Sequence, residues 1–186
     1  MLSRLFRRRP NGAGIPAALY GAIVARAREP ALFRDLQVPD TVDGRFEMVV
    51  AHCVLAIRRL REAGEPGRGL AQEVFDTFCT NMDQSLREMG VGDLAVPKRM
   101  KKIGEAFYGR LAAYDSALTA GDRGALTQAL QRNVYDGTGD QLAVDGLAAY
   151  MMAASRQLAA GPDGDLLGGA FDVPDAAVFS GERSGT

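Results

Sequence analysis

The sequence predicts an all-α fold, a single bundle of about six helices with a flexible C-terminal tail. Apolar residues recur at three- and four-residue intervals through most of the chain, which is the period of a helix with one buried face. Glycine and proline divide this pattern into segments of helical length. No run alternates polar and apolar residues for long enough to indicate a sheet. The chain has 186 residues, 47% of them hydrophobic, and is long enough to bury one core.

Two helices are predicted in the first third of the chain. The first covers residues 16–28, because Pro16 suits a first turn, where its missing N–H needs no partner. The second follows a cap at Asp40 or Thr41 and continues to Leu60. Since its apolar residues cover nearly every side, we expect this helix to be central.

Glycine and proline mark the boundaries of four further helices. Residues 64–69, which contain three glycines, are predicted to form a turn. From Gly161 onward, Gly, Pro and Asp dominate, so this tail is expected to be mobile and to add nothing to the core. The predicted domains are a basic segment at 1–15, a helical domain at 16–160 and the tail at 161–186. The four helices are predicted at 70–89, 97–120, 123–134 and 142–160.

Charge and apolar run lengths restrict the class of protein. Lys and Arg number 22 and Asp and Glu 23, so the net charge of −1 argues against DNA binding through overall charge. No apolar stretch approaches the ~20 residues that span a bilayer. The basic start of the chain lacks an apolar segment of the secretory type. We therefore expect a cytoplasmic protein.

Few residues are suited to catalysis or to metal binding. Cys53 and Cys79 form no CxxC pair, and the chain has one histidine, so no zinc site is predicted. Helical spacing places Met48 and Leu55 beside His52, surroundings that disfavour a charged imidazole. We interpret His52 as a packed, hydrogen-bonded histidine, and predict no catalytic residue, metal or cofactor.

Two groups of cations are candidates for contact with an anionic surface. Near such a surface each cation contributes about 1 kcal/mol, which favours weak contact with a membrane or with ribosomal RNA. For the helical group, solubility and complementation of the helix dipole are an equal alternative. The groups are Lys98, Arg99, Lys101, Lys102 and Arg110 on the outer face of one helix, and Arg4, Arg7, Arg8 and Arg9 at the N-terminus.

Several blocks of the sequence, taken in order, resemble the ubiquinol-cytochrome c chaperone family. The resemblance covers about residues 16–160 and leaves the tail outside. It implies a non-enzymatic all-α chaperone that binds cytochrome b, its nascent chain or an early intermediate and promotes assembly of the ubiquinol-cytochrome c reductase complex. The blocks are residues 19–28, 38–46, 58–60, 82–83, 85–90, 101–102, 107–110 and 130–135, with His52, Phe75 and Tyr114 between them.

The resemblance also implies partners and a location. Mitochondrial members are associated with the ribosome, so the ribosome and a second assembly factor are expected partners. The chain lacks a long Arg- and Ser-rich transit segment before the matching region and is similar to the bacterial form. We expect it in the cytoplasm, peripheral at the cytoplasmic face of the inner membrane. The polar members of the matching blocks are candidates for partner contact: Asp40, Arg45, Asp83, Arg87, Lys101, Lys102, Tyr108 and Arg132.

Two alternatives stay open. Arg45 and Asp83 can instead cap helices or pair within the bundle. A helical haem- or quinone-binding protein, with a pocket lined by His52, Met48, Met82 and Phe107, is the second function considered. Methionines at helical spacing are more common in a core than around a cofactor.

Overall fold

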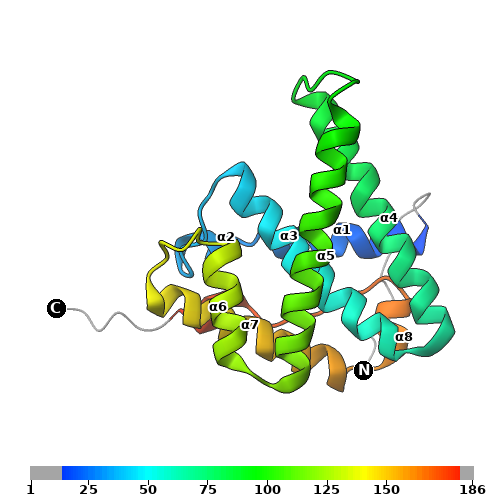
Figure 1. The fold of residues 1–186 in the computed structure, drawn as a ribbon. Helices are drawn as coiled ribbons and strands as arrows, with labels where there is room; N and C mark the ends of the chain where they lie inside the picture. Colours follow the sequence, from blue (N-terminus) through cyan, green and yellow to red (C-terminus); the bar gives the residue numbers. More distant parts are fainter. Residues whose placement is uncertain (1–13, 181–186) are drawn as a thin grey trace.

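The computed structural model describes residues 14–180. This part is helical throughout and has no strand, which confirms the predicted all-α fold. Within it, no helix is both long enough and apolar enough to cross a membrane. The helices, shown in Figure 1, are α1 (Ile15–Ala27), α2 (Pro30–Arg34), α3 (Val42–Glu62), α4 (Gly64–Glu88), α5 (Val96–Ala120), α6 (Arg123–Asn133), α7 (Gln141–Ala160), α8 (Asp163–Leu167) and the 3-10 helix η1 (Ala176–Phe179).

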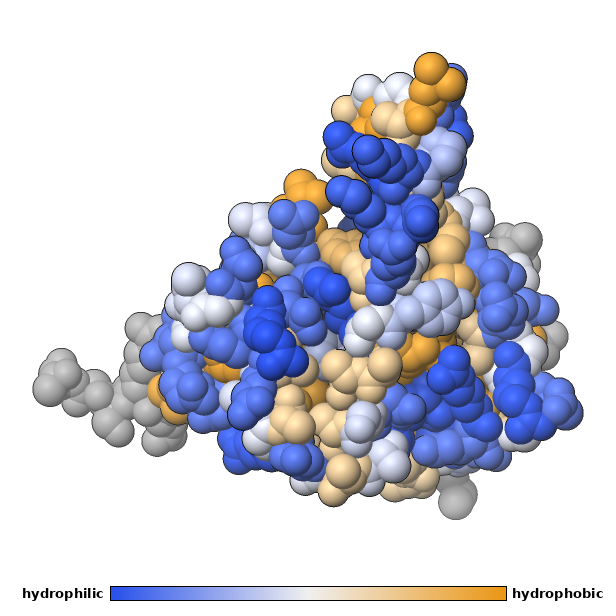
Figure 2. Space-filling view, viewed as in Figure 1, coloured by the Kyte–Doolittle hydropathy of each residue, from blue (hydrophilic) through white to orange (hydrophobic). Residues whose placement is uncertain are grey.

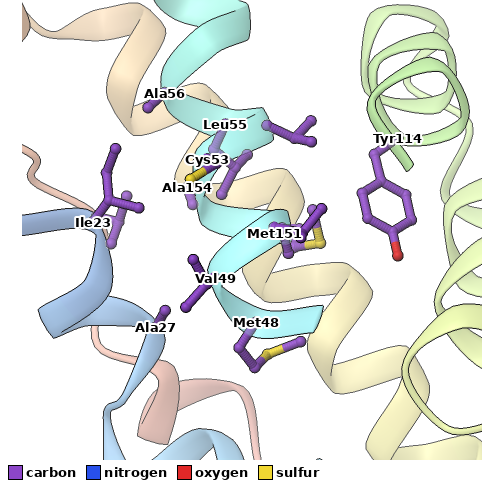
Figure 3. Packing of buried hydrophobic residues seen from close by; sticks show 14 of the residues in the cluster. Ile23, Ala27, Met48, Val49, Cys53, Leu55, Ala56, Tyr114, Met151 and Ala154 are labelled. Atoms are coloured by element: carbon purple, nitrogen blue, oxygen red, sulfur yellow. The ribbon is translucent and has the colours of Figure 1, made fainter. Parts of the chain in front are cut away.

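Helix α3 is the centre of the molecule, as its apolar pattern predicts. Helices α1, α4, α5, α7 and α8 all pack against it. Its side chains Met48, Cys53 and Leu55 are at most 1% exposed. Figure 3 shows Ile23 of α1 and Met151 of α7 on different sides of α3. The core therefore surrounds one helix, and polar side chains on α3 need partners inside the protein.

Polar caps and one glycine set the helix boundaries near the predicted positions. The Thr41 hydroxyl accepts a hydrogen bond from the Gly44 backbone N–H at the start of α3, at 3.1 Å. The Asp122 carboxylate accepts one from Ala125 at the start of α6, at 2.9 Å. Gly121 ends α5 with a φ of 65°, a left-handed conformation that favours glycine.

The prediction of a turn at residues 64–69 is wrong, because these residues form the first turns of α4. Helix α3 ends at Glu62, and Gly64, with a φ of 76°, redirects the chain at once. A Cβ added at Gly67 would lie 2.0 Å from the carbonyl oxygen of Leu60. The glycines therefore allow a sharp joint between two helices, and Pro66 is tolerated because it lies in a first turn.

Residues 163–180 pack against the bundle, so the expectation that the chain beyond Gly161 adds nothing to the core is wrong. Arg59 of α3 donates a hydrogen bond to the Gly161 carbonyl oxygen, at 3.1 Å, and forms an ion pair with Asp163. Sparse apolar residues that do not follow the helical period make contact here, which a search for periodicity misses. Four of them are at most 6% exposed: Leu166, Phe171, Val173 and Ala176.

Helices α4 and α5 form a hairpin that extends beyond the rest of the bundle (Figure 1). The connection between them, residues 89–95, is the hairpin tip. Figure 2 shows hydrophobic surface at this tip and hydrophilic surface below it. Leu94 is 100% exposed and Met89 is 58% exposed. The hairpin thus carries large apolar side chains far from the core.

Candidate functional site

A surface groove between α3, α4 and α5, here called the aromatic groove, is the best candidate for a binding site. Its volume is about 280 Å³. The rings of Phe75 and Phe107 lie 4.8 Å apart and those of Phe75 and Tyr108 lie 5.2 Å apart. Phe107 is 1% exposed, whereas Tyr108 is 54% exposed, so the cluster runs from core to surface. The lining residues are Ile57, Arg61, Arg68, Ala71, Gln72, Phe75, Phe107, Tyr108 and Leu111.

The rim of the aromatic groove is cationic and polar. Arg61 comes from the last turn of α3, while Arg68 and Gln72 come from α4. Arg68 is paired with Glu65, and Arg61 has no ion pair within 4.0 Å among residues 14–180. An apolar floor with a few polar groups at its edge suits an apolar segment of a partner.

His52 is fully engaged within the core. Its Nδ1 donates a hydrogen bond to the Met48 carbonyl oxygen, at 2.7 Å, so the neutral ring can accept the Tyr150 hydroxyl hydrogen at Nε2, also at 2.7 Å. Burial lowers the pKa of His52 to about 4. The predicted packed histidine is confirmed. His52 thus offers no free ring nitrogen to a haem iron, which argues against the haem part of the alternative function.

Arg110 turns inward, although the sequence groups it with the surface cations. Its Nη2 and Nε lie 2.7 Å and 3.0 Å from the two carboxylate oxygens of Glu47 on α3. The Glu47 side chain is 7% exposed and that of Arg110 is 22% exposed. Burial raises the pKa of Glu47, while the hydrogen bonds from Arg110 lower it. This fork-shaped pair joins α3 to α5.

Asp40 and Arg45 form an ion pair at the opening of a second groove, of about 450 Å³, near α2. The two atoms of the pair are 2.6 Å apart, and the hydrogen bond lowers the pKa of the Asp40 carboxyl. The Arg45 guanidinium also lies over the ring of Phe33, at 5.9 Å. Arg45 therefore pairs with a residue of its own chain, Asp40, which is the alternative considered for it above.

The other predicted residues are spread over the surface. Asp83 and Arg87 pair at 2.7 Å on α4. Arg132 lines a shallow depression on α6 and α7, so the candidates do not converge on one site. The other four predicted cations of α5 are exposed near the hairpin tip; they are Lys98, Arg99, Lys101 and Lys102. The predicted N-terminal cations lie outside the described residues; they are Arg4, Arg7, Arg8 and Arg9.

Sequence reasoning selected Tyr108 and missed most of the groove around it. Phe75 belongs to the resemblance blocks but was not proposed for contact, and Arg61 and Arg68 were not considered. Arg61 lies near the end of α3 and Arg68 near the start of α4, and the joint at Gly64 brings both side chains to the same groove. The predicted turn therefore concealed the rim.

The fold and the groove define a class, an all-α interaction protein built around one buried helix. The comparisons identify the family. The model of the ubiquinol-cytochrome C chaperone family matches residues 34–174, and the chain belongs to this family. A crystal structure of the Cbp3 homolog from Brucella abortus is 40% identical, with a TM-score of 0.80, and the alignment covers 87% of this chain and 90% of that one.

Curated relatives carry the name ubiquinol-cytochrome c reductase complex assembly factor 1. The protein of Xenopus laevis is 24% identical over 118 residues, which are 63% of this chain and 58% of that protein. The human protein is 25% identical over 118 residues, 63% of this chain and 39% of that protein. The chain thus matches a little more than half of the length of the Xenopus laevis protein and less than half of the length of the human protein.

Proposed function

We propose that this chain is a non-enzymatic assembly chaperone that binds cytochrome b, or an early intermediate containing it, through the aromatic groove. Membership in the chaperone family supports the assembly role. The observation that carries the proposal is the continuous cluster of rings that ends at the exposed Tyr108. Aromatic side chains supply large contact areas with little loss of conformational freedom, which suits an interaction surface.

The chemistry of the rim favours an apolar segment of the client. Cytoplasmic loops of membrane proteins are enriched in Lys and Arg, and Arg61, the rim arginine without an ion pair among residues 14–180, would repel them. The apolar end of a client helix that has not yet entered the bilayer can bind in the groove without that repulsion. Phe75, Tyr108 and Leu111 would contact it directly. We place this binding at the cytoplasmic face of the membrane.

The proposed chaperone role requires binding and no catalytic group, and His52, the residue considered for catalysis, is not free to act as one. Both nitrogens of His52 are bonded inside the core, so the imidazole has no free position from which to move a proton. The ribosome and a second assembly factor remain predicted partners, as do partner contacts at Asp40, Arg45 and Arg132.

Site-specific crosslinking tests the groove as the client site. A photoreactive residue at Gln72, exposed on the rim, should crosslink to cytochrome b in membranes of a strain that makes the complex. The matched control is Gln157, an exposed glutamine on α7. Tyr108→Ser should reduce crosslinking at Gln72 without changing Tm, because the ring is half exposed. Equal crosslinking at both positions would contradict the groove assignment.

Deletion of the gene tests the function as a whole. Assembled ubiquinol-cytochrome c reductase complex should be lost, while other respiratory complexes remain. Reintroduction of the Tyr108→Ser variant should restore less complex than reintroduction of the parent chain. Normal levels of cytochrome b and of assembled complex in the deletion strain would overturn the proposal.

A further inference from the structure

The hairpin tip carries apolar side chains that the fold does not use. Leu94 is 100% exposed and Met89 is 58% exposed, while Leu86 and Val96, at 6% and 2% exposure, already close the end of the helix pair. Burial in the bundle therefore does not explain Leu94 or Met89. Exposed apolar groups at the end of a projecting element mark a contact with something outside the chain.

Four cations follow the tip in the first two turns of α5, where they oppose the helix dipole. An α-helix favours anions near its N-terminus, yet the first turn of α5 has no acidic residue. The dipole explanation considered for this group is therefore wrong. Lys101 lies 3.8 Å from Glu105, and the other three have no ion pair within 4.0 Å among residues 14–180. The four cations are Lys98, Arg99, Lys101 and Lys102.

The acidic groups on the α4 side of the hairpin do not neutralise these cations. Arg87 pairs with both Asp83 and Asp93, and its single charge balances only one of these two carboxylates. Glu88 accepts a hydrogen bond from the Gln84 amide, at 2.9 Å. The carboxylates Asp83, Glu88 and Asp93 thus offset only part of the charge of the four cations, and the α5 side of the tip still presents a net positive surface beside the exposed Leu94.

We propose that the hairpin tip docks on an anionic lipid surface, with Leu94 and Met89 entering the interface and the four cations contacting headgroups. Apolar side chains next to Lys and Arg are the combination that interfacial segments use. RNA is a poorer match, because single-stranded RNA is held by aromatic stacking and residues 89–95 contain no aromatic residue.

Docking through the tip would also position the aromatic groove. From Val96 to Tyr108 the helix rises roughly 18 Å at 1.5 Å per residue, so the groove lies on the same hairpin at a short distance above the lipid. This step rests on the proposed function, because it concerns a client helix that emerges from the bilayer. The docking itself does not depend on the client.

Sedimentation of the purified full chain with vesicles tests the proposal. The chain should pellet with vesicles of phosphatidylcholine and phosphatidylglycerol, and less with phosphatidylcholine alone. Replacement of all four cations by Gln should weaken binding at least about tenfold and remove most of its salt dependence. The substitutions are Lys98→Gln, Arg99→Gln, Lys101→Gln and Lys102→Gln. Met89→Ser with Leu94→Ser should weaken it about tenfold at all salt concentrations.

Controls separate the hairpin from the rest of the chain. Val42→Ser with Val178→Ser removes apolar residues that are 69% and 71% exposed elsewhere, and should not change binding. A chain without residues 2–9 should still bind through the hairpin. The proposal would be overturned if both hairpin variants bound vesicles as the parent does, or if binding were lost only when residues 2–9 are removed. Binding to ribosomes but not to anionic vesicles would also overturn it. Since the vesicles contain no client, any of these results leaves the crosslinking test of the groove unaffected.

Discussion

Replacement of Arg110 by Met should expose the cost of a buried carboxylate. The side chain of Glu47 is 7% exposed and receives two hydrogen bonds from Arg110. Removal of one partner from a buried pair costs roughly 3–5 kcal/mol. Because the Arg110 side chain keeps 22% exposure, we expect the lower end, about 3 kcal/mol of unfolding free energy.

The loss should depend on pH in a defined direction. Without Arg110, burial and the nearby charge of Asp43 both hold the folded-state pKa of Glu47 above the ordinary value. A carboxyl with a raised folded-state pKa binds its proton more tightly in the folded chain, so lower pH favours folding. The deficit of Arg110→Met should therefore shrink as the pH falls from neutral toward the pKa of Glu47.

A second substitution gives the decisive comparison. Glu47→Leu combined with Arg110→Met removes the charge and fills the same space with apolar atoms, so stability should return to within about 1 kcal/mol of the parent. Urea unfolding followed by circular dichroism measures all three proteins. Arg87→Met, which breaks two exposed ion pairs, is the control and should leave the midpoint nearly unchanged. A double variant as unstable as Arg110→Met would refute this account of the pair.

Three other changes test the core. His52→Ala should lower the unfolding free energy by about 1–3 kcal/mol by unpairing Tyr150. The parent should lose stability as the pH falls from 6.5 toward 4, because the folded chain resists protonation of His52, and His52→Ala should abolish this loss. Phe171→Ala should cost about 3 kcal/mol in the same assay; no change would show that residues beyond Gly161 do not belong to the core. Gly67→Ala should lower Tm because its Cβ would meet the Leu60 carbonyl oxygen at 2.0 Å, whereas Gly69→Ala, with nothing within 4 Å of its Cβ, should raise Tm slightly.

Periodicity predicted the long helices well, because their faces are decided by local spacing. It located α3 as the central helix from its apolar residues alone. From residue type it located the cap of α6 at Asp122 and that of α3 at Asp40 or Thr41, of which Thr41 makes the cap. It failed where contacts distant in sequence decide. Residues 64–69 are compatible with an open turn and with a helix joint, and the close approach of Gly67 to the Leu60 carbonyl selects the joint.

The candidate site was less predictable than the fold for a related reason. Tyr108 and Arg110 are two residues apart on α5, and both were read as outward-facing polar residues. The structure directs Tyr108 to the groove and Arg110 to Glu47, which is 63 residues away in the sequence. A single helix pattern cannot show that Glu47 needs a cation, because the partner helix and its distance are tertiary properties.

The burial of the chain's one histidine gives the protein a built-in spectroscopic reporter. The imidazole of His52 touches three segments at once, through the Met48 carbonyl on α3, the Tyr150 hydroxyl on α7 and the ring of Phe171, whose centroid is 6.3 Å away. Nitrogen and proton resonances of this ring are free of overlap from other histidines, and ring currents from Phe171 and Tyr150 shift them. Titration with client peptides or vesicles would then reveal, from one signal, whether residues 163–180 remain seated on the bundle while the surface is occupied.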